Sequence, residues 1–114
     1  MVAVVAIQTL TLGQASRTYQ LITNCAGRRT GGTAGTAEDG GSYMFAGTYK
    51  NTAGAVAIVA GSPVSIYAQA VAAWTTPCTY GTPATNTVPV NCTTPANTNA
   101  HWMCSTEIKA SASS

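Results

Sequence analysis

The sequence predicts an all-β protein that folds as a single small antiparallel β-sandwich or barrel. Short runs rich in Val, Ile, Thr and aromatic residues recur along the chain, separated by turn signals made of Gly, Pro, Asn and Ser. Several runs alternate apolar and polar residues with a period of two, which is typical of a strand with one buried face. At 114 residues, the chain is long enough for one hydrophobic core and too short for two. The strand spacing favours a jelly-roll or immunoglobulin-like arrangement.

Residues 1–25 are expected to form the first two strands. The run 2–12 is dominated by β-branched residues, which favour extended backbone. The run 17–25 places four alternate residues on one face: Tyr19, Leu21, Thr23 and Cys25. A signal peptide is disfavoured, because no basic residue precedes the first run and the run contains Gln and Thr. The same run is too short and too polar for a transmembrane helix.

Residues 26–42 contain six glycines and are expected to form a long loop or arm, because ordering glycine costs more conformational entropy than ordering any other residue. Two arginines, Arg28 and Arg29, lie near its start, and two acidic residues, Glu38 and Asp39, lie near its end. Loops of this length usually have a function or are disordered. We therefore predict that these four residues contact a neighbouring subunit.

Residues 43–74 are expected to form the central strands. Alternation resumes at Tyr43, and turns are predicted at 51–54 and 61–63. The stretch 68–74 is rich in Ala, the best helix former, but it continues a β-branched run without a cap. Extended backbone is therefore predicted there as well.

The last third of the chain contains an irregular segment and then a closing strand. Residues 75–99 hold four of the five prolines and are expected to be an irregular excursion with one edge strand near 87–91, because proline cannot donate to a sheet ladder. Residues 100–109 form the closing strand, and residues 110–114 form a tail. The inner face of this strand is predicted to hold Trp102, Cys104, Thr106 and Ile108.

Four cysteines, Cys25, Cys78, Cys92 and Cys104, allow three pairings if all are oxidised. Cys25 and Cys104 both lie on strand faces shared with large apolar residues, so we expect them to pair in or across the core. Cys78 and Cys92 both lie in the proline-rich segment, where a bond between them would pin an irregular stretch of chain. The alternative is that all four are reduced and serve as small buried hydrophobic residues.

A zinc site is a further alternative, because Cys78, Cys92, His101 and Cys104 supply suitable donor atoms. The chain has no Cys-x-x-Cys knuckle, and His101 is expected on the wet side of the strand that turns Cys104 inward. We therefore expect neither a metal nor a cofactor.

Catalytic arrangements have few residues to draw on, since the chain contains one His, one Asp and two Glu. A Ser-His-Asp triad would need His101 to meet Asp39 from the Gly-rich segment. A carboxylate pair would need Glu107 to meet Glu38 or Asp39. We therefore predict no catalytic residues and no enzymatic activity.

Charged residues make up only 7% of the chain, and the net charge is +2. Scattered cations do not form the basic face that nucleic acid requires, so nucleic acid is not an expected partner. A weakly charged surface favours association with copies of itself or with a larger body. Trp74 and Trp102 are candidates for an aromatic surface that stacks on a glycan.

In general character, the chain resembles the small all-β structural proteins of tailed bacteriophage virions, the head decoration or cement proteins. The resemblance covers the starting Met1, the strand 2–12, the Gly-Thr-Ala stretch 31–37, the strand series 43–71 and the Ser/Ala tail. It implies a virion protein bound to a major capsid or other structural protein as a symmetric oligomer, such as a trimer. It also implies no catalytic residues. Disulfides would then form after host lysis, outside the reducing cytosol.

Two other functions fit the same pattern. One is a secreted or surface-displayed binding module, for example for glycans, located outside the cell. The other is a subunit of a pilus-like filament.

Overall fold

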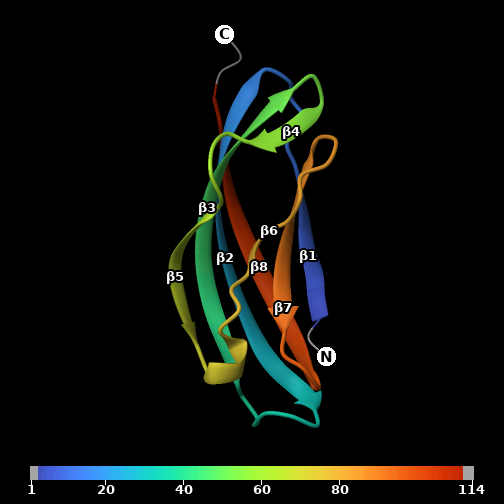
Figure 1. The fold of residues 1–114 in the computed structure, drawn as a ribbon, viewed down its shortest axis with the longest axis vertical. Coiled ribbons are helices and arrows are strands. Elements are labelled where there is room, and N and C mark those ends of the chain that lie inside the picture. The colour runs from blue at the N-terminus through green and yellow to red at the C-terminus, as the bar shows by residue number, and fades with distance from the viewer. Residues whose placement is uncertain (1–2, 112–114) are drawn as a thin grey trace.

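A computed structural model describes residues 3–111 and shows a β-sandwich of two antiparallel sheets (Figure 1). The smaller sheet has the strand order β1 (Ala3–Thr11), β7 (Thr87–Thr94) and β6 (Thr79–Tyr80). The larger sheet has the order β4 (Ala55–Ile58), β3 (Gly40–Thr52), β2 (Arg17–Gly32) and β8 (Thr98–Ala110), and β5 (Val64–Ala70) also pairs with β3. The all-β prediction is confirmed, and the sandwich is the architecture found.

The molecule is elongated, with extents of 52 × 22 × 21 Å, and its long strands run along the long axis (Figure 1). β4 and β5 lie one after the other along the same side of β3, where β4 pairs near Tyr49 and β5 near Tyr43. Among residues 3–111 there is no helix long and apolar enough to cross a membrane.

The core lies between the two sheets. Alternation along β7 buries every second residue, and β2 and β3 do the same over their middle sections. The most deeply buried large side chains are Tyr43, Tyr49, Phe45, Leu12, Leu21, Val88 and Val90. The alternation predicted for β2 and for the closing strand β8 is confirmed, although Ile108 stays 43% exposed at the sheet edge.

The predicted loop at 26–42 is wrong. β2 continues to Gly32 and β3 begins at Gly40, so a short turn joins two paired strands. Glycine is used here because other groups approach closely: a Cβ on Gly27 would lie 2.4 Å from Cζ3 of Trp102, and one on Gly40 would lie 2.2 Å from the Gly27 carbonyl oxygen. Hydrogen bonds to β3 on one side and β8 on the other offset the entropy lost on ordering.

The proline-rich segment 75–99 is also more ordered than expected. Instead of an edge strand near 87–91, β7 is the middle strand of its sheet and runs to Thr94. Proline has no N–H to donate to a ladder, so its place in a middle strand needs a reason. Pro89 lies beyond the last pair of the β6–β7 ladder at Tyr80, and only its carbonyl is used on that side, where it accepts from the Gly81 N–H.

Two smaller differences concern chain ends and one turn. Extended backbone in 68–74 stops at Ala70, and Ala72–Trp74 form one 3₁₀ turn that turns Trp74 inward. In the predicted tail, Ala110 ends β8 and Ser111 is described, whereas residues 112–114 lie outside the described residues, as do Met1 and Val2.

Candidate functional site

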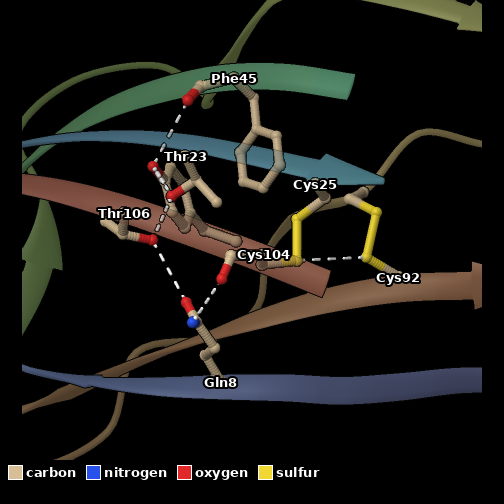
Figure 2. The surroundings of a disulfide bond; sticks show 9 residues. Gln8, Thr23, Cys25, Phe45, Cys92, Cys104 and Thr106 are labelled. Carbon is tan, nitrogen blue, oxygen red and sulfur yellow. Dashed lines mark hydrogen bonds between the residues drawn. A yellow bond between two sulfur atoms is a disulfide. The ribbon is translucent and has the colours of Figure 1, made fainter. Parts of the chain in front are cut away.

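Both predicted disulfide bonds are confirmed: Cys25 is joined to Cys104 (Figure 2), and Cys78 is joined to Cys92. Cys25 and Cys104 are directly opposed residues of β2 and β8. Cys78 immediately precedes β6, one position beyond the Thr79–Asn91 pair, and so stands opposite Cys92 of β7. Each sheet therefore carries one disulfide between adjacent strands.

The two disulfides meet in the core and form a single sulfur cluster, made of Cys25, Cys78, Cys92 and Cys104. The Sγ atoms of Cys92 and Cys104 are 3.9 Å apart, although they belong to different disulfides and different sheets (Figure 2). The Sγ atoms of Cys25, Cys78 and Cys92 all lie within 4.8 Å of one another, and these three residues are buried. The zinc-ligand set considered from sequence does not form, because His101 lies exposed on the outer face of β8 and Cys25 takes its place in the cluster.

A chain of polar side chains crosses the core beside the sulfur cluster (Figure 2). The Thr106 hydroxyl donates to Gln8 Oε1 at 3.4 Å and lies 2.8 Å from the Thr23 hydroxyl, which lies 2.8 Å from the Tyr80 hydroxyl. The Tyr80 hydroxyl is also within reach of the Phe45 carbonyl, to which it donates at 3.5 Å. Gln8 Nε2 also donates to the Cys104 carbonyl at 2.8 Å. The polar chain therefore joins β1 and β6 of the smaller sheet to β2 and β8 of the larger sheet.

Burial controls the ionisation of Tyr80. It raises the pKa of Tyr80 to about 12, and the hydrogen bond with Thr23 offsets only part of this rise. Burial also raises the pKa values of Tyr43 and Tyr49. These hydroxyls therefore act as neutral hydrogen-bonding groups of the core.

The predicted aromatic surface is wrong, because Trp74 is buried and Trp102 is half-buried. Their ring centroids are 5.4 Å apart, and the Tyr43 ring lies 6.1 Å from Trp102. The Tyr43 hydroxyl donates to the Trp74 carbonyl, and Trp102 Nε1 donates to Thr94 Oγ1 at 3.1 Å. These rings close one end of the core and offer no exposed platform for a sugar.

The four charged residues predicted as assembly contacts gather at the β2–β3 turn, where they divide into two kinds. Arg29 donates to the carbonyls of Ala34 and Gly32, and the Asp39 carboxylate accepts from the Thr36 N–H. These two residues hold the turn itself. The other two, Arg28 and Glu38, form an exposed ion pair at 3.9 Å, and their role in assembly stays a prediction.

The residues considered for catalysis are not brought together. His101 projects from the outer face of β8, in register with Arg28 of β2. Glu107 forms an exposed ion pair with Lys109 at 3.4 Å. Within residues 3–111, no hydrogen bond joins His101 to Asp39, Glu38 or Glu107, so neither a triad nor a carboxylate pair is assembled.

The most unusual surface belongs to β5, and sequence reasoning missed it. Six of its seven residues are exposed, including Val64 at 62%, Ile66 at 54% and Tyr67 at 47%. The strand contains no charged residue and no proline, and in the described part of the chain it pairs with β3 alone. Among residues 3–111, no strand pairs with the other edge of β5. No local sequence signal marks this exposure, because β5 is left uncovered by the shortness of β6 in the fold.

A shallow groove of about 360 Å³ runs along the outer face of the larger sheet beside β5. Tyr67 of β5 stands on one side and Met103 of β8, itself 68% exposed, on the other. The small residues Ala26 and Ser42 form the floor between them. Apolar surface therefore extends from the β5 edge across the sheet.

The chain matches no protein-family model, and it likewise matches no curated protein and no solved structure.

Proposed function

We propose that the chain is a non-enzymatic structural subunit that assembles through the free edge of β5. The observation that carries this proposal is a seven-residue edge strand with six exposed residues and no charge. A free edge of this kind offers a row of N–H and C=O groups that pair with another strand. The partner that we assign is β5 of a second copy, in antiparallel orientation.

Pairing of β5 with itself satisfies three features of the surface. It joins two larger sheets into one continuous sheet and satisfies the backbone groups of both edges. It also places Val64 and Ile66 of both copies beside cross-strand neighbours, which shields part of their apolar surface from water. No like charges meet, because β5 carries none, and the interface is isologous, as in most dimers.

The larger assembly that we favour is the head of a tailed bacteriophage, with this chain as a decoration or cement subunit on a major capsid protein. The compositional resemblance described above supports this choice. The elongated, disulfide-bonded body and the low charge suit a subunit that lies against a protein shell. The exposed pair Arg28 and Glu38 at the β2–β3 turn is the contact that we assign to the shell.

Two exposed isoleucines at opposite edges of the same sheet provide a matched test. Ile66→Lys places a charge on β5, whereas Ile108→Lys places the same charge on β8, which already carries Glu107 and Lys109. Sedimentation velocity over a range of concentrations should show that the wild type and Ile108→Lys associate and that Ile66→Lys stays monomeric. Wild-type protein that remains monomeric, or an Ile66→Lys variant that associates like the wild type, would contradict the proposal.

A second experiment tests the virion assignment. Electron microscopy of the native source should place the chain on an icosahedral shell, and an Arg28→Glu variant should bind that shell more weakly than the wild type. A chain found in a filament would favour the pilus-like alternative. A dispersed chain that binds glycans would favour the surface-displayed module.

A further inference from the structure

We propose that the sulfur cluster is a redox-dependent metal site: when its two disulfides are reduced, Cys25, Cys78, Cys92 and Cys104 bind one Zn²⁺ ion as four thiolates. This inference is independent of the proposed function.

The spacing between the sheets already suits such a site. Zinc binds thiolates at about 2.3 Å, so the sulfurs of a tetrahedral site lie about 3.8 Å apart. The Cys92 and Cys104 sulfurs, which belong to different disulfides, are 3.9 Å apart, and those of Cys25, Cys78 and Cys92 lie within 4.8 Å of one another. After reduction the two bonded sulfur pairs have to move apart, and the Cys104 sulfur, which lies outside the 4.8 Å cluster, has to move toward that of Cys78. Rotation about the Cα–Cβ bonds provides these movements.

The chemistry of the cluster matches zinc rather than a hard cation. All four donors are sulfur, and no carboxylate or imidazole belongs to the cluster in the described part of the chain. Three of the four residues are buried, so four thiolates would be strongly destabilised there without a cation. Structural zinc sites with four cysteines are closed in this way.

The change between the two states requires a reductant, which we assign to the class of dithiols. Each disulfide takes up two electrons and two protons to give two thiols, while one dithiol is oxidised to its disulfide. Zn²⁺ then replaces the four thiol protons, which are released to water. Cys104 is the one half-buried member, so the Cys25–Cys104 bond is the first that a reductant reaches.

The two states link different parts of the fold. Each disulfide joins neighbouring strands within one sheet. A zinc ion would instead join Cys25 and Cys104 of the larger sheet to Cys78 and Cys92 of the smaller one. The zinc-bound protein would thereby gain a metal cross-link between the sheets, whereas both disulfides of the oxidised protein lie within single sheets.

Cobalt provides the readout, because Co²⁺ bound by four thiolates in a tetrahedron absorbs strongly in the visible and near ultraviolet. The full chain is reduced with a phosphine, desalted without oxygen and titrated with Co²⁺ and then Zn²⁺. We expect the tetrathiolate spectrum at one Co²⁺ per chain and its loss on displacement by Zn²⁺. If reduction unfolds the chain, Zn²⁺ should restore its β-sheet circular dichroism. Absence of the cobalt spectrum would overturn the proposal, whether the reduced chain is folded or unfolded.

Two variants identify the ligands. Cys92→Ser should abolish the tetrathiolate spectrum and weaken Co²⁺ binding by roughly 100-fold or more, as expected when a ligand is lost. His101→Ala is the matched control, since His101 lies outside the cluster, and it should leave the spectrum and the affinity unchanged. An unchanged spectrum in Cys92→Ser, or a lost one in His101→Ala, would show that the metal binds elsewhere.

Discussion

β8 and β5 lie at opposite sides of the same sheet, yet they are fastened very differently. β8 pairs with β2 over its whole length, is bonded to it through Cys25–Cys104, and accepts a hydrogen bond from Gln8 of the other sheet. β5 pairs with β3 over six positions and has neither a disulfide nor a hydrogen bond to the smaller sheet within the described residues.

The difference extends to the surface chemistry of the two strands. β8 carries Glu107 and Lys109, and charged side chains of this kind discourage pairing with other chains. β5 has no charge and exposes large apolar side chains. β8 is therefore firmly held by β2 and carries charged side chains, whereas β5 is held by β3 alone within the described residues and carries none. Four experiments test this contrast, in order of decreasing effect on stability.

The largest effect is expected from unfastening β8. The double variant Cys25→Ala/Cys104→Ala removes a bond with a sequence separation of 79, which in the chain-entropy model lowers the free energy of unfolding by about 4–5 kcal/mol. The control, Cys78→Ala/Cys92→Ala, removes a separation of 14 and should lower it by about 3 kcal/mol. Urea denaturation of oxidised protein measures both. A smaller loss from the first variant than from the second would contradict the idea that the Cys25–Cys104 bond is the stronger of the two fastenings.

High pH should destabilise the side of the core that holds the polar chain. Folding raises the pKa of Tyr80 from its ordinary value of 10.0 to about 12, so the folded state disfavours ionisation. Stability is therefore full below pH 10 and falls between pH 10 and about 12, by roughly 2–3 kcal/mol from Tyr80 alone. Tyr43 and Tyr49 add to the loss in the same direction.

Tyr80→Phe provides the control for this pH dependence. It should lower stability at neutral pH by about 1 kcal/mol, through the lost hydrogen bond to Thr23, and make the alkaline loss smaller than in the wild type. Urea denaturation from pH 8 to 12 measures the difference. An unchanged alkaline slope would show that the tyrosine ionises only after unfolding of another part of the chain.

Two glutamines compare the edges directly. Gln8→Ala removes the hydrogen bond to the Cys104 carbonyl and leaves Thr106 without its acceptor, so it should destabilise the fold by about 1–2 kcal/mol. Gln69→Ala on β5 removes only an exposed hydrogen bond from the Tyr67 hydroxyl and should change stability by less than about 0.5 kcal/mol. Equal losses in thermal or urea denaturation would remove the distinction between the two edges.

The smallest effect is local and leaves the global stability unchanged. In the monomeric Ile66→Lys variant, amide hydrogens of β5 that face β3 should exchange with solvent through low-energy openings, whereas those of β8 that face β2 should exchange only on global unfolding. Native-state hydrogen exchange measures both sets in one sample. Equal protection of the two strands would show that β5 is as firmly held as β8.

The sequence predicted the β8 side of this contrast but not the exposure of β5. Alternation in 100–109, and the faces it assigned to Cys25 and Cys104, predicted both the closing strand and its disulfide, because a period of two fixes which side chains meet. Alternation along 64–67 predicted a strand as well, but it does not say whether another sheet covers that strand. The exposure of β5 depends on how far β6 extends, which is a property of the whole fold.

The two regional errors have a common physical origin. Glycines in 26–42 were interpreted by their entropy cost, and prolines in 75–99 by their missing donor, both of which are local properties. In the fold, Gly27 is required by the Trp102 ring, and Pro89 lies just beyond the point where the ladder between β6 and β7 ends at Tyr80. Tertiary contacts of this kind are absent from any single stretch of sequence.

The Cys25–Cys104 bond also determines how the molecule would respond to mechanical tension. β1 begins near one end of the long axis and β8 ends near the other (Figure 1). Force applied at the two ends would be transmitted through the first strands to Cys25, through the disulfide to Cys104, and then through the remainder of β8. The chain between these two cysteines would bear no load. The oxidised subunit would therefore lengthen little after its terminal strands peel away, whereas the reduced subunit would extend along its full contour.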